Sequence, residues 1–435
     1  MSKGYGAMEK RRVKDSDLGD SAPKSGLCVN SRYLDQPFPN FRKPVLIGSF
    51  SVNAQRQFQP DNANLKFLHR NVDRDERVSF DLNRGMNSVT TKNEDETTQE
   101  GIKMLLTWIS LNQGKFTVML DQKATKASSL NTDFVCFRGL MTCIMCTPYE
   151  YREGWTISAV KFKDTIYLLK IESEAQATQR RNWDDKMKRI LTWGYKFEQY
   201  MMTDQPGQEP DANEPMNTNE EFCGMFRTRL GSHSLVYGAE MDGLVMDTSA
   251  PQDKDAIDLT QAEFAELKCS RQMDHPKQER NFVKYKLIKW WAQSFLVGVP
   301  KVICGFRDDR GTVNSLRSYP VTEMPKLGKR DWLPNVCMNF LNNFLSFVKA
   351  EMSRSTEGEN TISFVNDVLM VYYNSSWSGA ALPYSPPEAK NLVMPSNVPE
   401  NEMRIVSCYN ETKLIQLVIC ASFTWSSYCL KLKTS

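Results

Sequence analysis

Hydrophobic spacing divides this chain of 435 residues into helical and extended segments. Apolar residues recur at intervals of three and four, the spacing of one helix face, over 97–113, 180–202, 277–297 and 339–352. Shorter apolar runs, typical of strands, occupy 115–120, 132–147, 155–162, 165–171 and 299–308. Consecutive runs of this kind predict a mixed or antiparallel sheet flanked by helices, so we expect an α/β (α+β) fold.

The predicted helix over 180–202 carries one acidic residue on its apolar stripe. The apolar positions are Trp183, Met187, Ile190, Leu191 and Gly194. Eleven residues return a helix almost to the same direction, so Glu198 falls on the stripe that begins at Met187. An acid on an apolar face needs a partner. The alternative is that the helix ends near Gly194 and that Glu198 is exposed.

The stretch "GAEMDGLV" (238–245) resembles a buried strand but carries two acids. Side chains alternate along a strand, so Glu240 and Asp242 point to the same face. Two carboxylates held that close repel each other, and their burial is unfavourable unless a cation or a proton compensates. The pair is therefore a candidate site for cation binding.

A second predicted strand, "FAELK" (264–268), also carries two charged residues two positions apart. Phe264, Glu266 and Lys268 share one face, and if the two strands are neighbours, these charges converge with the first pair of acids. Three carboxylates supply the oxygen ligands that hard divalent ions prefer, and an ammonium group can steady a water or a phosphate oxygen. The alternative is a pair of solvated strand faces.

Composition limits the classes of partner. Lys and Arg total 55 against 52 Asp and Glu, so any nucleic-acid site must be a local patch. Eleven irregularly spaced cysteines indicate free thiols in a reducing compartment, and we expect Cys143 and Cys146 to be two buried strand thiols. No run of eighteen apolar residues is present, so no contact with a membrane is expected. The basic run "KRRVK" (10–14) is typical of a nuclear import signal or of a solvated tail.

The chain is expected to form one domain with two irregular segments. Residues 1–40 are polar and predict a flexible arm, and 41–435 are assigned to a single domain. Within it, 203–221 is rich in acids and prolines and predicts a disordered acidic loop.

Five motifs in order give the chain a family resemblance. They are "FRGLMTCIMCTPYE", "GYKFE", "FRTRLGSHSLVYGAEMD", "FAELKCSR" and "KWWAQSFLVGVPKVICGFRD". In this order they resemble the DXO family of RNA 5′-end decapping enzymes and 5′-to-3′ exoribonucleases, over about residues 100–350. The resemblance implies two mixed β-sheets with surrounding helices, a central active-site cleft and a metal site like that of PD-(D/E)XK nucleases.

The resemblance also implies a role for each matching residue. The positions that hold two Mg²⁺ or Mn²⁺ ions in the family are matched by Glu198, Glu240, Asp242, Glu266 and the backbone carbonyl of Leu267. Lys268 and Gln293 match residues beside the scissile phosphate, and Arg138 matches one that contacts RNA. Cys269 departs from the family, where a threonine is expected.

These features predict a metal-dependent hydrolase of RNA 5′ ends. The expected activities are removal of incomplete caps or NAD caps, pyrophosphohydrolysis of a 5′ triphosphate, and 5′-to-3′ exoribonuclease action. Two alternatives stay open: an RNA-end-binding adaptor of weak activity that stimulates a nuclear 5′-to-3′ exoribonuclease, and a nuclease that acts on DNA. The expected location is the nucleus, with the cytoplasm as a second site.

Overall fold

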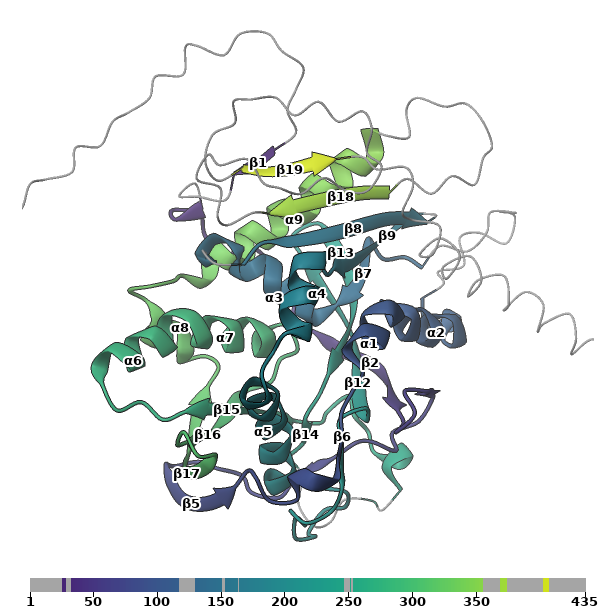
Figure 1. Cartoon of the computed structure of the whole chain (residues 1–435). Helices are drawn as coiled ribbons and strands as arrows, with labels where there is room; N and C mark the ends of the chain where they lie inside the picture. The colour runs from purple at the N-terminus through teal and green to yellow at the C-terminus, as the bar shows by residue number, and fades with distance from the viewer. Residues whose placement is uncertain are drawn as a thin grey trace, which may run out of the picture.

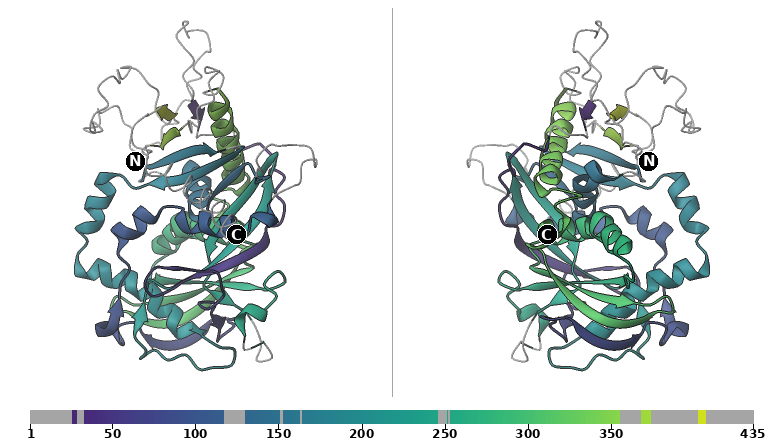
Figure 2. Two further views of the ribbon diagram at one scale, coloured as in Figure 1. Left: turned by 90° about the vertical axis from the view of Figure 1, so that its right-hand side faces the viewer. Right: turned by 90° about the vertical axis from the view of Figure 1, so that its left-hand side faces the viewer.

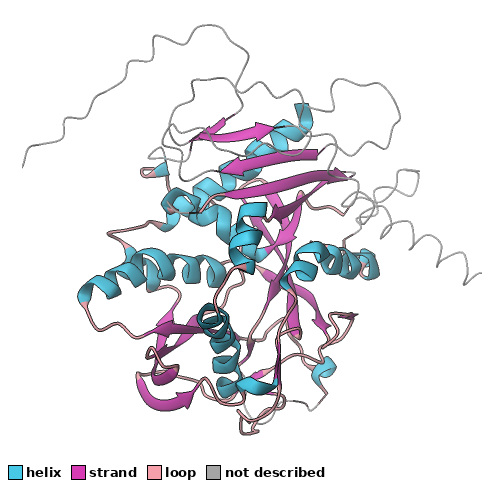
Figure 3. Ribbon diagram, in the orientation of Figure 1, coloured by secondary structure: helices cyan, strands magenta, loops and turns pink. Residues whose placement is uncertain are grey.

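The computed structural model describes residues 26–28, 33–116, 130–150, 153–162, 164–245, 251, 253–354, 368–373 and 402–406. In these residues two large mixed sheets are surrounded by helices, which confirms the predicted fold class (Figures 1 and 3). Most of the expected arm (1–40) lies outside the described residues. The apolar stretch at the end of the sequence, 414–435, lies wholly outside them. Among the helices of the described part, none is long and apolar enough to cross a membrane.

A ten-stranded sheet, called the upper sheet, runs from the top of Figure 1 to the middle of its right-hand side. Its order is β1 (Gly26–Cys28), β19 (Glu402–Val406), β18 (Val368–Tyr373), β8 (Trp155–Phe162), β9 (Thr165–Ile171), β7 (Phe134–Phe137), β13 (His233–Glu240), β12 (Glu221–Leu230), β2 (Val45–Val52) and β3 (Phe58–Gln59). The β7 strand runs parallel to β9 and β13, whereas β12 pairs antiparallel with β13 and β2. The sheet is therefore mixed, as expected.

A seven-stranded sheet lies below it. Its order is β10 (Met202–Thr203), β4 (Phe67–Leu68), β14 (Gly243–Leu244), β15 (Phe264–Arg271), β16 (Lys301–Arg307), β17 (Thr312–Pro320) and β5 (Glu76–Asp81). A parallel pair of short strands, β6 (Val89–Thr90) and β11 (Met216–Asn217), stands apart from both. Since β15 and β16 are parallel, the chain must cross over between them, and it does so through a helix.

Helices cover the faces of the sheets. They are α1 (Glu94–Glu100), α2 (Lys103–Leu111), α3 (Arg138–Cys146), α4 (Glu174–Arg181), α5 (Asp185–Met201), α6 (Pro276–Asn281), a π-helical segment (Phe282–Leu287), α7 (Ile288–Phe295), α8 (Met324–Gly328) and α9 (Pro334–Arg354). The crossover from β15 to β16 runs through α6, the π-helical segment and α7. In the side views, α4 and α5 form one edge of the molecule (Figure 2). The apolar residues of α3, α7 and α9 join one core cluster with the upper sheet.

The chain passes from the upper sheet to the lower one within a few residues. Strand β13 ends at Glu240, and β14 begins at Gly243. The backbone N–H of Met241 still donates to Phe222 of β12, whereas that of Leu244 donates to Lys66 beside β4. A Cβ atom at Gly243 would lie 2.7 Å from the sulfur of Met202 and 2.8 Å from a backbone oxygen, so this close crossing requires glycine.

Helix α5 corrects the predicted apolar stripe. The helix extends to Met201, so the alternative in which it ends near Gly194 is wrong. Its buried apolar side chains are Trp193, Phe197 and Met201, which pack on the lower sheet. Met187 and Leu191 are exposed instead. The helical spacing was predicted correctly, but the buried row that contains Trp193 and Phe197 lies one position before the predicted Gly194 and Glu198.

Three further segments differ from their predictions. Residues 132–147 form a strand only as far as Phe137 and continue as α3, so Cys143 and Cys146 are free thiols on a helix, not on a strand. Gly101, with a φ of 54°, separates α1 from α2 within the single helix predicted there. The acidic loop packs against the body: β11 pairs with β6, and the buried Lys196 donates to the carbonyl of Ala212 at 2.6 Å.

The contact between α5 and β16 generates a stability prediction. A Cβ atom at Gly305 would lie 2.5 Å from the ring of Phe197. We expect Gly305→Ala to lower the free energy of unfolding by about 1–3 kcal/mol, because overpacking displaces that ring. Gly194 lies on α5, and a Cβ atom there would meet no atom within 4 Å. Gly194→Ala should therefore raise the free energy of unfolding by up to about 1 kcal/mol. Urea unfolding monitored by circular dichroism measures both, and equal effects would contradict the packing account.

Candidate active site

Two of the predicted acids flank the crossing between the sheets. Glu240 is the last residue of β13, and Asp242 precedes β14. Because Gly243 pairs with Ala265 in antiparallel register, Asp242 lies opposite the start of the "ELK" motif in β15. Its Oδ2 atom accepts the backbone N–H of Leu267 at 2.5 Å. The two motifs singled out in the sequence are therefore brought together.

Glu266 lies at the centre of a buried ion cluster. Its side chain is 1% exposed, and each of its oxygens accepts from a cation. Arg138, the first residue of α3, donates from Nη1 at 3.3 Å, and Lys268 donates from Nζ at 2.5 Å. Both cations lower the pKa of Glu266 against the effect of burial, which alone would raise it. Glu266 is therefore ionised in the folded protein.

The pKa values of Asp242 and Glu240 are raised instead. Burial raises the pKa of Asp242 to about 7, and the Glu266 carboxylate adds to the shift. The pKa of Glu240 is also raised to about 7, first because protein atoms crowd around it and then because Glu221 and Asp242 are near, although its side chain reaches solvent. These acids repel one another and favour a proton or a cation between them.

Glu198 joins the same cluster from α5. Burial raises its pKa well above the usual value, and the next contributions come from Asp242 and Glu240, with Glu266 last. The helix packs against β15, so Glu198 approaches the acids from the lower sheet side. All four acids predicted from the sequence thus act on one another electrostatically.

The donor set has the chemistry of a divalent-cation site. The predicted ligands, four carboxylates and the backbone carbonyl of Leu267, are hard oxygen donors of the kind that Mg²⁺ and Mn²⁺ take. In the part of the chain that the structure describes, however, no three His, Cys, Asp or Glu side chains already lie close enough to hold a metal ion. Both oxygens of Glu266 are occupied by Lys268 and Arg138. The acids would thus have to rotate toward a bound ion.

The remaining predicted residue, Gln293, lies on α7 and is half-buried. This helix packs against α3 and β16, and the crossover makes it run back along β15. Seven residues before Gln293, Lys286 reaches Ser270 at the far end of β15. From Ser270 the crossover helix runs antiparallel to β15, toward the start of β16, which pairs with Glu266. Gln293 therefore lies farther along the helix in the direction of Glu266 and Lys268.

A second charged network beside Glu240 was missed from the sequence. Glu221, the first residue of β12, pairs with Lys92 and, at 2.9 Å, with Arg56. Arg56 also binds Glu100 at 2.7 Å. These partners are far apart in the chain and belong to no shared motif, so local spacing gives no signal for them.

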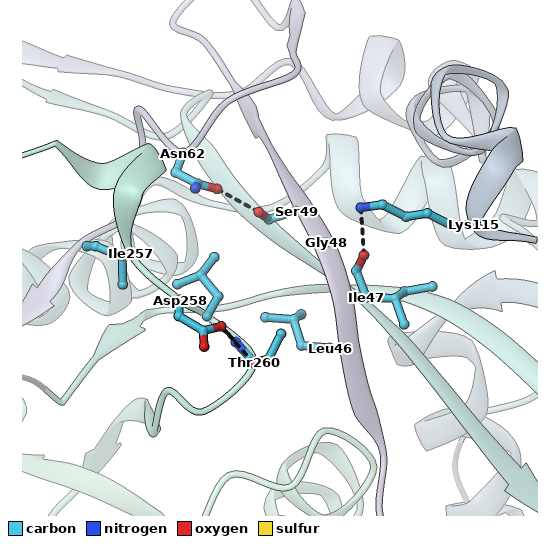
Figure 4. Close-up of a pocket in the computed structure, with 10 residues that line it drawn as sticks. Leu46, Ile47, Gly48, Ser49, Asn62, Lys115, Ile257, Asp258 and Thr260 are labelled. Carbon is cyan, nitrogen blue, oxygen red and sulfur yellow. Dashed lines mark hydrogen bonds between the residues drawn. The ribbon is translucent and has the colours of Figure 1, made fainter.

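The hollow drawn in Figure 4 lies away from these acids. It measures about 540 Å³ and lies between β2 and residues 257–260. Ser49 donates to Asn62 at 2.6 Å, and Lys115 donates to the Ile47 carbonyl at 2.9 Å (Figure 4). None of the residues predicted for catalysis lines it, so it is separate from the candidate site.

Comparison with known proteins places the sequence among nucleases. Residues 42–389 match the family model described as RAI1-like PD-(D/E)XK nuclease. The chain belongs to this family. The decapping and exoribonuclease protein of Xenopus laevis is 38% identical over 73% of this chain and 78% of its own length. The human protein of the same name is 37% identical over 79% of this chain and 83% of its own length.

Solved structures of Rai1 proteins share the fold. Scheffersomyces stipitis Rai1, determined with (3′-NADP)⁺ and a calcium ion, has a TM-score of 0.69 at 20% identity and covers 93% of this chain and 99% of its own. Candida albicans Rai1, determined with pU5 and Mn²⁺, has a TM-score of 0.69 at 18% identity over 94% and 100%. The predicted family and the predicted enzyme class, a nuclease, are confirmed.

The raised pKa values predict how stability depends on pH. In the metal-free folded protein Asp242 holds its proton up to a pH of about 7, whereas an unfolded Asp releases it near pH 4. The resulting stabilisation is full below pH 4 and is lost as the pH rises to about 7. We therefore expect Asp242→Asn, which cannot ionise, to gain stability relative to wild type from pH 4 to pH 7.

Urea unfolding in EDTA at pH 4.5, 6, 7 and 8 measures this difference. Glu263→Gln, which removes an exposed carboxylate outside the cluster, is the matched control. Parallel pH profiles for wild type and Asp242→Asn would contradict the shift.

Adding Mn²⁺ at pH 8 should raise the melting temperature of wild type more than that of Asp242→Asn, because a divalent ion would replace the missing proton.

Proposed function

We propose that this protein is a divalent-metal-dependent hydrolase that acts on RNA 5′ ends. The observation that carries the proposal is the convergence of Glu198, Glu240, Asp242 and Glu266 at the crossing between the sheets. The names of the curated relatives, decapping and exoribonuclease proteins, support RNA 5′ ends as the substrate class. Removal of incomplete or NAD caps, 5′-triphosphate pyrophosphohydrolysis and exonucleolytic shortening are the proposed activities.

We propose Mg²⁺ or Mn²⁺, two ions in all, as the cofactor. The ligands would be the four acids and the carbonyl of Leu267, and the Mn²⁺ and calcium ions of the two Rai1 structures support a divalent ion. When bound, such ions stabilise the charges of an in-line displacement at phosphorus and lower the pKa of a bound water.

The protein's own residues would divide the remaining work. Lys268, held by Glu266 at the edge of the cluster, is 24% exposed and can donate to a phosphate oxygen. Gln293 would orient the same phosphate from α7. Arg138 is 6% exposed and engaged with Glu266, so its main work is to hold that carboxylate, and contact with RNA requires its guanidinium to turn.

The adaptor alternative, an RNA-end-binding protein of weak activity that stimulates a nuclear 5′-to-3′ exoribonuclease, stays a prediction from the sequence. That nuclease partner and the nuclear location stay predictions from the sequence.

A time course on RNAs with different 5′ ends tests the proposal. The substrates are 5′-monophosphate, 5′-triphosphate, NAD-capped and unmethylated-capped RNA, each with Mn²⁺, Mg²⁺ or EDTA and with a matched DNA oligonucleotide as a control. We expect metal-dependent removal or shortening of the RNA 5′ end. The double variant Glu240→Ala/Asp242→Ala should be slower by at least about 100-fold, because it loses the ion's stabilisation of charge.

Glu263→Gln serves as the control for folding and should cleave at the wild-type rate. Binding without cleavage of any RNA by wild type would overturn the hydrolase proposal and favour the adaptor. Preferential cleavage of the DNA oligonucleotide would overturn the choice of RNA.

A further inference from the structure

Helix α5 lies at one edge of the molecule, covered on two sides and open on a third (Figure 2). Trp193 and Phe197 pack on the lower sheet. Lys196, on the next side, is buried and donates to the carbonyl of Ala212 in the acidic loop. On the open side, a Cβ atom at Gly194 would meet no atom within 4 Å. The surface of the helix around Gly194 is therefore accessible to a ligand.

The open side carries a line of three residues that ends at the acidic cluster. Met187 and Leu191 are 43% and 47% exposed. Each residue turns an α-helix by about 100°, so both point within about 20° of the direction of Glu198. At a rise of about 1.5 Å per residue, Leu191 lies roughly 10 Å and Met187 roughly 16 Å before Glu198 along the helix. A strand that leaves the cluster along this side of α5 meets Leu191 first and then Met187.

One cation accompanies the two apolar residues. Lys188 is exposed and points about 80° to one side of the line. Its side chain forms no ion pair with any residue that the structure describes. Arg180 and Arg181 of α4, in contrast, are paired with carboxylates. Asp184 caps α5 by accepting the backbone N–H of Met187, so it marks the far end of the line.

Exposed apolar side chains beside a cation suit a single nucleic-acid strand. Proteins that bind single strands combine cations, which contact the phosphates, with side chains on which the bases pack. Leucine supplies apolar surface, and the sulfur of methionine interacts favourably with aromatic rings. Exposed apolar surface also suits a protein partner. The line is continuous with an acidic cluster whose proposed substrate is RNA, and its cation complements an anionic backbone, so both features favour the RNA strand.

We propose that Met187, Lys188 and Leu191 form a wall, here called the α5 wall, that binds the RNA strand next to the 5′ end held at the acidic cluster. The bases pack on Leu191 and Met187, and Lys188 contacts the backbone phosphates. The α5 wall rests on the proposed function of the cluster, and it assigns substrate binding to residues outside the five motifs. Because it reads no base edge, its contribution is the same for oligo(U) and oligo(A).

A double variant of the apolar residues tests the wall by RNA binding. We expect Met187→Gln/Leu191→Gln to bind 5′-monophosphorylated oligo(U) about 10-fold more weakly than wild type, because two apolar contacts are lost. Glutamine forms helices about as readily as methionine and leucine, so the melting temperature should stay at the wild-type value. Leu327 of α8 is 54% exposed on a helix without a predicted site residue, so Leu327→Gln is the matched control and should bind like wild type.

Conservative variants separate RNA binding from a structural role. Leu191→Met keeps the apolar surface and should bind oligo(U) within about twofold of wild type. Weaker binding by Leu191→Met as large as that of the double variant, or a lowered melting temperature in both, would show that the residues support the helix and would overturn the wall.

The salt dependence of binding tests the role of Lys188. We expect the slope of log K against log salt to fall by about 0.7 for Lys188→Met, which loses one phosphate contact. Lys186→Met removes the same charge from the same turn of α5, but Lys186 is exposed about 120° away from the line, so its slope should equal that of wild type. Equal slopes for the two variants would contradict the phosphate contact.

Single abasic nucleotides identify the bases that pack on the wall. An abasic position opposite Leu191 or Met187 should weaken wild-type binding yet leave the double variant unaffected, whereas every other position should weaken both equally. The coupled positions should follow the 5′ end directly and should be the same in oligo(U) and oligo(A). Absence of coupling at every position would overturn the wall.

Fluorescence anisotropy in EDTA measures these affinities and does not need cleavage. Failure of wild type to cleave RNA would therefore count against the proposed function alone. Equal RNA affinity of wild type, the double variant and Lys188→Met would count against the wall alone and would leave its apolar residues to a protein partner.

Discussion

Repulsion among the carboxylates that meet at the crossing between the two sheets is the constraint on which the site depends. Glu240 and Asp242 flank a crossing of the chain from one sheet to the other, and Glu198 and Glu266 approach the same place from the lower sheet. Only Glu266 has cations on both oxygens. The other three have raised pKa values, because desolvation and mutual repulsion favour a proton or a divalent ion at each of them.

The fold brings these acids together through three rigid contacts. Gly243 permits the close crossing, and the backbone of Leu267 fixes Asp242 against β15. Phe197 fits against Gly305, which fixes the part of α5 that carries Glu198. The parallel crossover between β15 and β16 then brings α7 and the π-helical segment along the same strand. Short π-helical segments are often found at functional sites.

The sequence predicted these parts unequally. The alternation along "FAELK" predicted that Phe264 and Leu267 face opposite sides of the strand, because side chains alternate along any strand. In the structure Phe264 is in one core cluster and Leu267 is in another, as predicted. The period of α5 was also correct, but its orientation was not, because Met187 and Leu191 are apolar and yet face solvent. Periodicity gives the spacing of a face, and tertiary packing decides which row is buried.

Other features had no local signal. Residues 134–146 are apolar at most positions, so the change from strand to helix at Arg138 could not be read from periodicity. Glu221 finds Lys92 and Arg56 only because β12 returns beside distant segments. The pairing of Lys286 with Ser270 likewise depends on how the crossover helix returns along its strand.

The location of bound Mn²⁺ in a crystal, from its anomalous X-ray scattering, tests the central claim most directly. The account predicts anomalous density among the carboxylates of Glu198, Glu240, Asp242 and Glu266, with the carbonyl of Leu267 as a further ligand. It also predicts that Glu266 exchanges an oxygen from Lys268 or Arg138 to the ion. Mn²⁺ bound elsewhere while this cluster stays empty, with Glu266 still held by both cations, would contradict the account.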